Sequence, residues 1–164
     1  MAYLQRSIPD AEFRVADLSA WDDPDGRTFD IVQSVEVLHL ILDDDAMMRA
    51  LANLARRIAP GGALLVTAAL PDQTVQRSDY LRYRSRAFWD TAIASLALRL
   101  AAERPMYYWL PAGGPVNKYL RYALTRLGPG ALYAVDRAAF ALGLPRPPSA
   151  CIDSRMRLLT LQRA

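Results

Sequence analysis

The sequence has very few of the side chains that build disulfides and metal sites. Its 164 residues include one cysteine, Cys151, and one histidine, His39. A single cysteine excludes a disulfide framework and a cysteine-built metal site, and a single histidine excludes a site built from several histidines. Lysine is equally rare, because all but one of the 20 basic residues are arginine.

Long uncharged apolar runs are also absent. No stretch reaches the roughly 18 residues of a membrane span, because Asp90, Arg99 and Asp136 interrupt the candidates. The amino terminus lacks the basic-then-apolar pattern of a signal peptide. With 52% hydrophobic and 23% charged residues, the composition excludes a disordered chain and predicts one domain with an apolar core. We therefore expect a soluble, cytoplasmic protein.

Charge is divided unevenly along the chain. Residues 1–80 carry 7 Arg and 13 Asp or Glu, whereas residues 81–164 carry 12 Arg, one Lys and 4 Asp or Glu. One interpretation is that the basic half binds an anionic partner. The alternatives are that the two halves attract each other, or that an acidic segment missing from this sequence lies beside the basic half. Arginines interleaved with aromatic residues at 80–89 also suit nucleic acid. The scarcity of lysine indicates compositional bias instead, so we do not expect a nucleic-acid partner.

The first seventy residues predict alternating strands and helices. Residues 12–17 and 29–34 have strand patterns, and a turn-rich loop separates them. Acidic residues at 43–45 then precede one apolar helical stripe, formed by Met47, Leu51, Leu54 and Ile58. Pro60, Gly61 and Gly62 are expected to end this helix, and the apolar run 63–70 predicts a strand covered on both faces, as in a parallel sheet. This order indicates an α/β fold.

Three of these segments, in this order, resemble the middle of a class I S-adenosylmethionine-dependent methyltransferase. They are residues 13–17, residues 29–39 and residues 54–62, of which the last two are the most specific. The resemblance covers residues 1–70 and, more loosely, 154–163. It implies a Rossmann-like sheet whose third, fourth and fifth strands are residues 13–16, 29–33 and 63–69. Residues 155–163 would form the seventh strand, an antiparallel strand at the edge.

The glycine-rich turn that follows the first strand in that family is not found. Each glycine pair ends a helix or lies between prolines, and none follows a strand and opens a helix. We therefore expect a partial sheet, strands three to seven, in a single truncated domain spanning residues 1–164. The chain is then a fragment, one half of a split enzyme or a degenerate homologue. The third strand would pair with the fourth, pair with another chain or stay poorly ordered, so self-association through an exposed strand edge is a further expectation.

The resemblance implies roles for residues just after two of the strands. Asp17 would accept a hydrogen bond from the adenine amino group of S-adenosylmethionine, and Leu18 would offer its backbone N–H to a ring nitrogen. Ser34, Val35 and Glu36 would wall the methionine half of the cofactor. The structural alternatives are a turn aspartate at 17 and a solvated acid at 36.

His39 is the candidate catalytic residue. A histidine five residues after Ser34 could accept a proton from an oxygen or nitrogen nucleophile during methyl transfer. Its flanking leucines favour a packed, hydrogen-bonded histidine as the alternative. Methyl transfer depends mainly on alignment of the nucleophile, the methyl group and the sulfur, so the absence of a catalytic triad does not exclude this class.

The basic second half is expected to contain a helical insertion, residues 78–147, before the last strand. Ser78–Arg104 is predicted to be one helix, followed by helices over 116–127 and 131–142. Tyr107, Tyr108 and Trp109 would line an apolar or aromatic acceptor site, or else form the core of the helical layer. Peripheral membrane contact through the 81–104 helix is a further hypothesis, linked to a lipid-bearing acceptor.

The function predicted for the intact protein is methyl transfer from S-adenosylmethionine to a small-molecule acceptor, a lipid-linked one included. This chain alone is expected to be inactive and to bind the cofactor weakly or not at all. Two alternatives come from other classes of protein. One is a non-catalytic interaction module that kept the sheet, and the other is a basic helical module that docks on an anionic surface.

Overall fold

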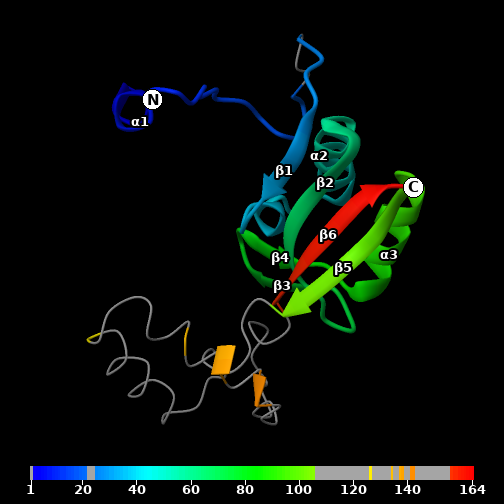
Figure 1. The fold of residues 1–164 in the computed structure, drawn as a ribbon. Helices are drawn as coiled ribbons and strands as arrows, with labels where there is room; N and C mark the ends of the chain where they lie inside the picture. Colours follow the sequence, from blue (N-terminus) through cyan, green and yellow to red (C-terminus); the bar gives the residue numbers. More distant parts are fainter. Residues whose placement is uncertain are drawn as a thin grey trace.

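The computed structural model describes residues 2–21, 25–105 and 156–164, with a few separate positions between 126 and 142. A short helix α1 (Ala2–Ser7) precedes strand β1 (Phe29–Ser34), the 3-10 turn η1 (Leu38–Leu40), helix α2 (Asp44–Arg56) and strand β2 (Ile58–Ala69). A hairpin of β3 (Val75–Ser78) and β4 (Leu81–Tyr83) follows, then helix α3 (Arg86–Ser95), β5 (Leu98–Pro105) and β6 (Met156–Arg163) (Figure 1). No helix of this described part is long and apolar enough to cross a membrane.

The main sheet has four strands in the order β1-β2-β6-β5. Strands β1 and β2 are parallel, and β6 runs antiparallel to both β2 and β5. The strands predicted at residues 29–33, 63–69 and 155–163 are therefore confirmed, as is the antiparallel direction of the last one. Its predicted place at the edge is wrong, because β6 lies between two strands and β5 forms that edge.

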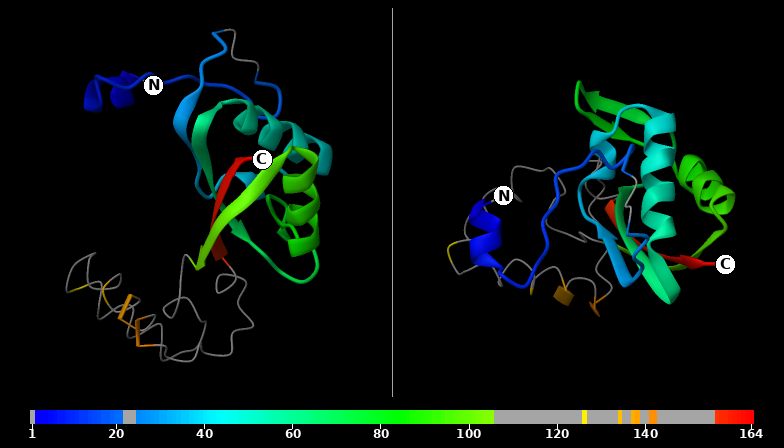
Figure 2. Two further views of the ribbon diagram at one scale, coloured as in Figure 1. Left: turned by 45° about the vertical axis from the view of Figure 1, so that its right-hand side comes forward. Right: turned by 90° about the horizontal axis from the view of Figure 1, so that it is seen from above.

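Both longer helices pack on one face of the sheet and enclose the core (Figure 2). The stripe predicted on α2 is confirmed: Met47 and Leu51 are completely buried, and they meet Leu64 and Val66 of β2. The carboxylate of Asp43 caps the helix by accepting a hydrogen bond from the backbone N–H of Ala46, 2.7 Å away. These contacts make α2 and β2 the centre of the fold.

The Pro60–Gly62 segment belongs to β2 and does not end the helix. Helix α2 stops at Arg56, and Ile58, expected at the end of the helical stripe, begins the strand instead. A Cβ atom added at Gly62 would lie 2.8 Å from the backbone oxygen of Asp30. The glycine therefore permits the close approach of β1 to the start of β2.

The strand predicted at residues 13–16 does not form. Residues 12–17 have no strand assignment, and the side chain of Val15 is 85% exposed. The segment is held instead by ion pairs of Arg14 with Glu12 and Asp25, at 2.5 and 2.8 Å. An extended segment becomes a strand only when a neighbour takes up its backbone N–H and C=O groups, and no described strand pairs with these residues.

The single helix predicted over Ser78–Arg104 is also wrong. The range contains part of a hairpin, a ten-residue helix and strand β5. Ser85 caps α3 through a hydrogen bond from the backbone N–H of Phe88 to its hydroxyl, and Ala97 follows the helix with a φ of 50°. Tyr107, Tyr108 and Trp109 lie outside the described residues. So do the predicted helices at 116–127 and 131–142, apart from Arg126, Ala134, Arg137, Ala138, Ala141 and Leu142.

Candidate functional site

A tight turn follows β1 at the carboxyl end of the two parallel strands. Ser34 is the last residue of β1 and is buried, whereas Val35 and Glu36 are exposed. Glu36 has a φ of 56°, the left-handed region that residues with a Cβ rarely adopt. Its backbone N–H donates a 2.7 Å hydrogen bond to the Oγ1 atom of Thr67 on β2. Sequence reasoning missed Thr67, although it is the one polar side chain in the apolar run 63–70.

His39 lies on η1, directly after this turn, and is half-buried. Its ring lies 5.4 Å from the ring of Tyr83, at an angle of 43°. Burial lowers the pKa of His39, and the charge of Glu36 partly opposes that shift. The ring therefore stays neutral near pH 7 and is able to accept a proton. His39 lines a small pocket, together with Leu38, Met47, Thr67, Arg82, Tyr83 and Trp89 among others.

The segment between His39 and α2 is fixed by Arg84, which the sequence analysis did not single out. The Arg84 side chain is 2% exposed, and its Nη2 atom donates to the backbone oxygens of Ile41, Leu42 and Asp43 at 2.8–3.3 Å. Its Nε atom donates to the carboxylate of Asp44 at 2.9 Å. Burial lowers the pKa of Arg84 while Asp44 opposes the shift. The guanidinium therefore ties the chain after β4 to the loop that carries His39.

Asp17 and Leu18 form a separate corner near the other end of α2. One carboxylate oxygen of Asp17 accepts hydrogen bonds from the backbone N–H and the hydroxyl of Ser19, at 2.9 and 2.8 Å. These bonds lower the pKa of Asp17. The backbone oxygen of Leu18 accepts a 2.8 Å hydrogen bond from the side-chain amide of Asn53, a buried residue of α2.

The structure does not bring this corner together with the turn after β1. The backbone N–H of Phe29, at the amino end of β1, donates to the oxygen of Arg57, just after α2. Helix α2 therefore runs opposite to β1, and Asn53 near its carboxyl end lies toward the amino end of the strand. Ser34, Glu36 and His39 lie at the carboxyl end. The predicted site residues thus form two groups at opposite ends of β1.

The described residues lack the glycine turn that would hold the nucleotide end of S-adenosylmethionine. Among the described glycines, Gly26 lies in a loop, and Gly61 and Gly62 lie within β2. None of these three follows a strand and opens a helix, which is the arrangement that lets backbone approach a nucleotide. The described residues therefore contain no glycine cradle of this kind for the nucleotide end of the cofactor. They also contain no group of three or more His, Cys, Asp or Glu residues that could hold a metal ion.

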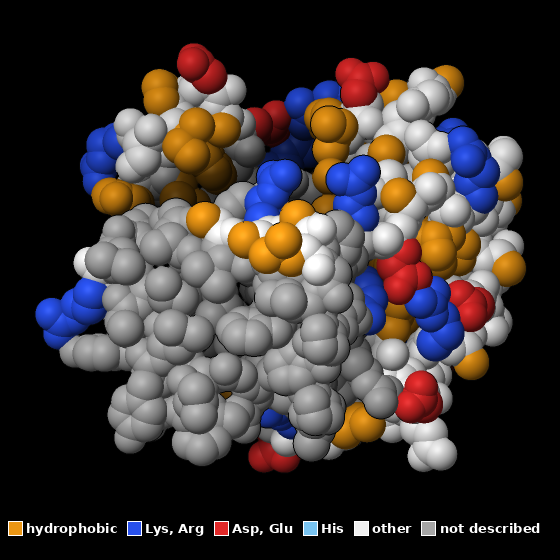
Figure 3. All heavy atoms as spheres, turned by 60° about the horizontal axis from the view of Figure 1, so that its bottom comes forward, with side chains coloured by type: hydrophobic (Ala, Val, Ile, Leu, Met, Phe, Trp, Pro, Cys, Tyr) orange, Lys and Arg blue, Asp and Glu red, His pale blue; other side chains and the backbone are white. Residues whose placement is uncertain are grey.

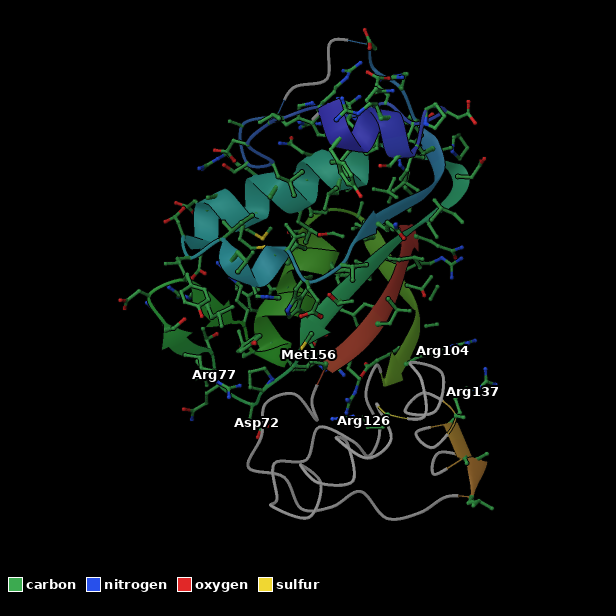
Figure 4. The ribbon with its side chains drawn as sticks, turned by 90° about the vertical axis from the view of Figure 1, so that its left-hand side faces the viewer. Asp72, Arg77, Arg104, Arg126, Arg137 and Met156 are labelled. Atoms are coloured by element: carbon green, nitrogen blue, oxygen red, sulfur yellow. The ribbon has the colours of Figure 1, made fainter. Side chains whose placement is uncertain are left out.

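The remaining loops at this end of the sheet follow β2 and β5. Asp72 and Arg77 come after β2, and Arg104 and Met156 lie where β5 ends and β6 begins (Figure 4). Seen from this end, the described surface mixes basic, acidic and hydrophobic side chains (Figure 3).

Comparison with known proteins relates the chain to methyltransferases. Residues 1–66 match the family described as "Methyltransferase domain". A SAM-dependent methyltransferase from Leishmania major has a similar fold, with a TM-score of 0.59 and 12% identity over 96% of this chain and 49% of that one. No curated protein matches the chain.

Two further solved structures carry ligands. The O-methyltransferase from the trans-AT PKS multienzyme of Brevibacillus brevis, in complex with S-adenosyl-L-homocysteine, has a TM-score of 0.59 and 14% identity over 99% of this chain and 53% of that one. An O-methyltransferase from neocarzinostatin biosynthesis, in complex with S-adenosylmethionine and 2-hydroxy-5-methyl naphthoic acid, has a TM-score of 0.54 and 15% identity over 99% of this chain and 38% of that one. The chain thus spans about half of the length of these structures, or less.

The described fold is part of the Rossmann-like fold of class I methyltransferases. Together with the family match over residues 1–66, this confirms the resemblance inferred from the sequence. Residues 1–66 thus match a methyltransferase domain family, and the described fold is similar to part of the fold of SAM-dependent methyltransferases.

Proposed function

We propose that this chain contributes the substrate-side half of a SAM-dependent methyltransferase site that acts on a small molecule. The observation that carries the proposal is the turn after β1. It lies at the carboxyl end of two parallel strands, where ligands bind in open α/β sheets. Its backbone is pinned to Thr67, and His39 follows it within three residues.

The chain's own residues would have three tasks in this reaction. Ser34, Val35 and Glu36 would bound the methionine end of the cofactor, mostly with backbone groups. His39 would accept the proton that the nucleophile of the acceptor loses, because its lowered pKa keeps the ring neutral at pH 7. The cofactor, when bound, supplies an activated methyl group, so the main contribution of the protein is alignment.

Asp17 and Leu18 remain proposed contacts to the adenine ring, but this role requires a rearrangement. They lie beside the carboxyl-terminal part of α2, away from the turn at 34–36. Pairing of residues 13–16 with a neighbouring strand would have to carry them to the other end of the sheet. In the arrangement described, we therefore expect weak cofactor binding that uses the turn and not Asp17.

An NMR titration of the 164-residue chain with S-adenosyl-L-homocysteine tests this proposal. We expect amide shifts confined to residues 34–39, with an affinity no tighter than about millimolar, which corresponds to roughly 4 kcal/mol. Asp17→Ala should leave these shifts unchanged if the corner stays apart, and should weaken them if it joins the site. Shifts elsewhere, or none at millimolar ligand, would contradict the proposed site.

A second candidate function is that of an interaction module. Within the part of the chain that the structure describes, strand β1 pairs with β2 alone, and its Phe29 and Ile31 are 43% and 65% exposed. An open strand edge with apolar side chains is suited to pairing with another chain. Self-association through this edge is therefore the proposal that competes with catalysis.

A further inference from the structure

Thr67 is unusual among the residues of the central strand. Strand β2 is hydrogen-bonded to β1 on one side and to β6 on the other, so its backbone is fixed along both edges. The Thr67 side chain is 2% exposed, and its hydroxyl oxygen accepts the 2.7 Å hydrogen bond from the N–H of Glu36. A buried hydroxyl on such a strand is a rigid point of attachment for the loop that it contacts.

The contact falls at the one strained position of the turn. Glu36 holds a φ of 56°, which is unfavourable for a residue with a Cβ atom. A residue persists in that region when surrounding contacts hold it there. The side chain that the structure offers for this purpose is Thr67. The same side chain also lines the small pocket that contains His39.

We propose that Thr67 is a positioning residue of the methyltransferase site. Its hydroxyl holds Glu36 in the left-handed conformation, and this conformation gives the turn at 34–36 the shape that walls the methionine end of the cofactor. The role rests on the function proposed above and adds a residue from β2 to it. Thr67 itself is buried and acts through the turn.

Paired substitutions separate the hydroxyl from the volume of the side chain. Thr67→Val keeps the volume and removes the acceptor, whereas Thr67→Ser keeps the acceptor. Thr160→Val is the matched control, because Thr160 is a partly buried threonine on the neighbouring strand β6. Amide hydrogen exchange of Glu36 reports on the turn without any ligand, and titration with S-adenosyl-L-homocysteine reports on the cofactor wall.

In Thr67→Val, we expect exchange of the Glu36 amide to accelerate about tenfold, which is the effect of one lost hydrogen bond. The ligand-induced shifts at residues 34–39 should require about three- to tenfold more ligand. Thr67→Ser and Thr160→Val should behave as the unsubstituted chain does. A thermal melt of each variant shows whether the fold is intact.

Two results would overturn the role of Thr67: unchanged exchange at Glu36 in Thr67→Val, or faster exchange with an unchanged ligand response. A complete lack of response in the unsubstituted chain would overturn the proposed function and the cofactor role of Thr67 together. In that event, amide exchange at Glu36 would still show whether Thr67 anchors the turn, because this measurement needs no ligand.

Discussion

Two parts of this molecule are held in place by different kinds of contact. Residues 29–105, with β6, pack around an apolar core in which Met47, Leu51 and Leu64 are completely buried. Of the described residues before β1, Leu18 alone packs against that core. The other described residues of this segment make mainly polar contacts, such as the ion pairs of Arg14 and Arg27 with Glu12 and Asp25. Exposed ion pairs contribute little to stability. The comparison therefore predicts that the two parts differ sharply in what they contribute to folding.

The largest expected effect comes from the core of α2. Leu51→Ala should reduce the free energy of unfolding by about 2–5 kcal/mol, through lost apolar burial and the cavity left behind. The matched control is Val15→Ala in the amino-terminal segment, which should change the free energy of unfolding by less than about 0.5 kcal/mol. Urea unfolding followed by circular dichroism measures both. Comparable losses for the two variants would mean that residues 2–28 belong to the cooperative fold.

The next effect comes from Arg84. Arg84→Leu would leave the backbone oxygens of Ile41, Leu42 and Asp43 without their buried donor. We expect a loss of about 2–3 kcal/mol in unfolding free energy, because a buried acceptor left unpaired costs roughly 1–3 kcal/mol. Asp44 adds less, since its side chain is 46% exposed.

Arg14→Leu is the matched control for this prediction. Arg14 pairs with two acidic side chains, one more than Arg84, but at the surface. It should cost far less than Arg84→Leu in the same urea measurement. Equal losses would show that the number of ion pairs, and not burial, determines the contribution of an arginine here.

The elements predicted correctly from the sequence are those that have a clear hydrophobic pattern and also a described strand or helix to pair with or pack against. The apolar run 63–70 and the strand at 29–33 pair with each other, and the stripe on α2 covers them, so all three were predictable. Residues 13–16 have an equally clear alternating pattern, but no described strand pairs with them, and there the pattern failed. Periodicity reports what a segment is able to bury, and not whether a partner exists.

The helix predicted over Ser78–Arg104 failed for a different reason. Apolar residues recur there near helical spacing, but the range includes a two-residue turn at Asp79 and Tyr80 and a helix start at Ser85. These local signals outweighed the apparent stripe. Strand β5 was missed as a result, although its pairing with β6 completes the sheet.

The candidate site was predicted in outline only. The turn at 34–36 and His39 were found because they follow a recognisable strand. Thr67 and Arg84 were not, because each acts through a residue 31 or more positions away in the sequence. Contacts of this kind depend on the tertiary fold, which no local pattern contains.

A smaller effect concerns the edge of β1 that faces away from β2. If the chain self-associates through this edge, sedimentation equilibrium should show a concentration-dependent increase in mass. Ile31→Lys should abolish that increase, because a charge on an edge strand opposes pairing. Leu100→Lys on the opposite edge strand, β5, should not affect it. A monomer at all concentrations would contradict the self-association proposal.

The smallest effect is the titration of His39. Burial lowers its pKa below the ordinary value of 6.5, and Glu36 raises it in part. Glu36→Gln should therefore lower the pKa of His39 further. The control Asp10→Asn, in the amino-terminal segment, should leave that pKa unchanged. The NMR shifts of the ring protons of this single histidine measure the pKa in both variants. Because the folded pKa lies below the unfolded one, the unfolded chain takes up a proton first as the pH falls. Stability should thus decrease as the pH falls through 6.5 toward the folded pKa, over a wider interval in Glu36→Gln. An unchanged pKa in Glu36→Gln would show that the Glu36 carboxylate lies too far from the ring to stabilise its protonated form.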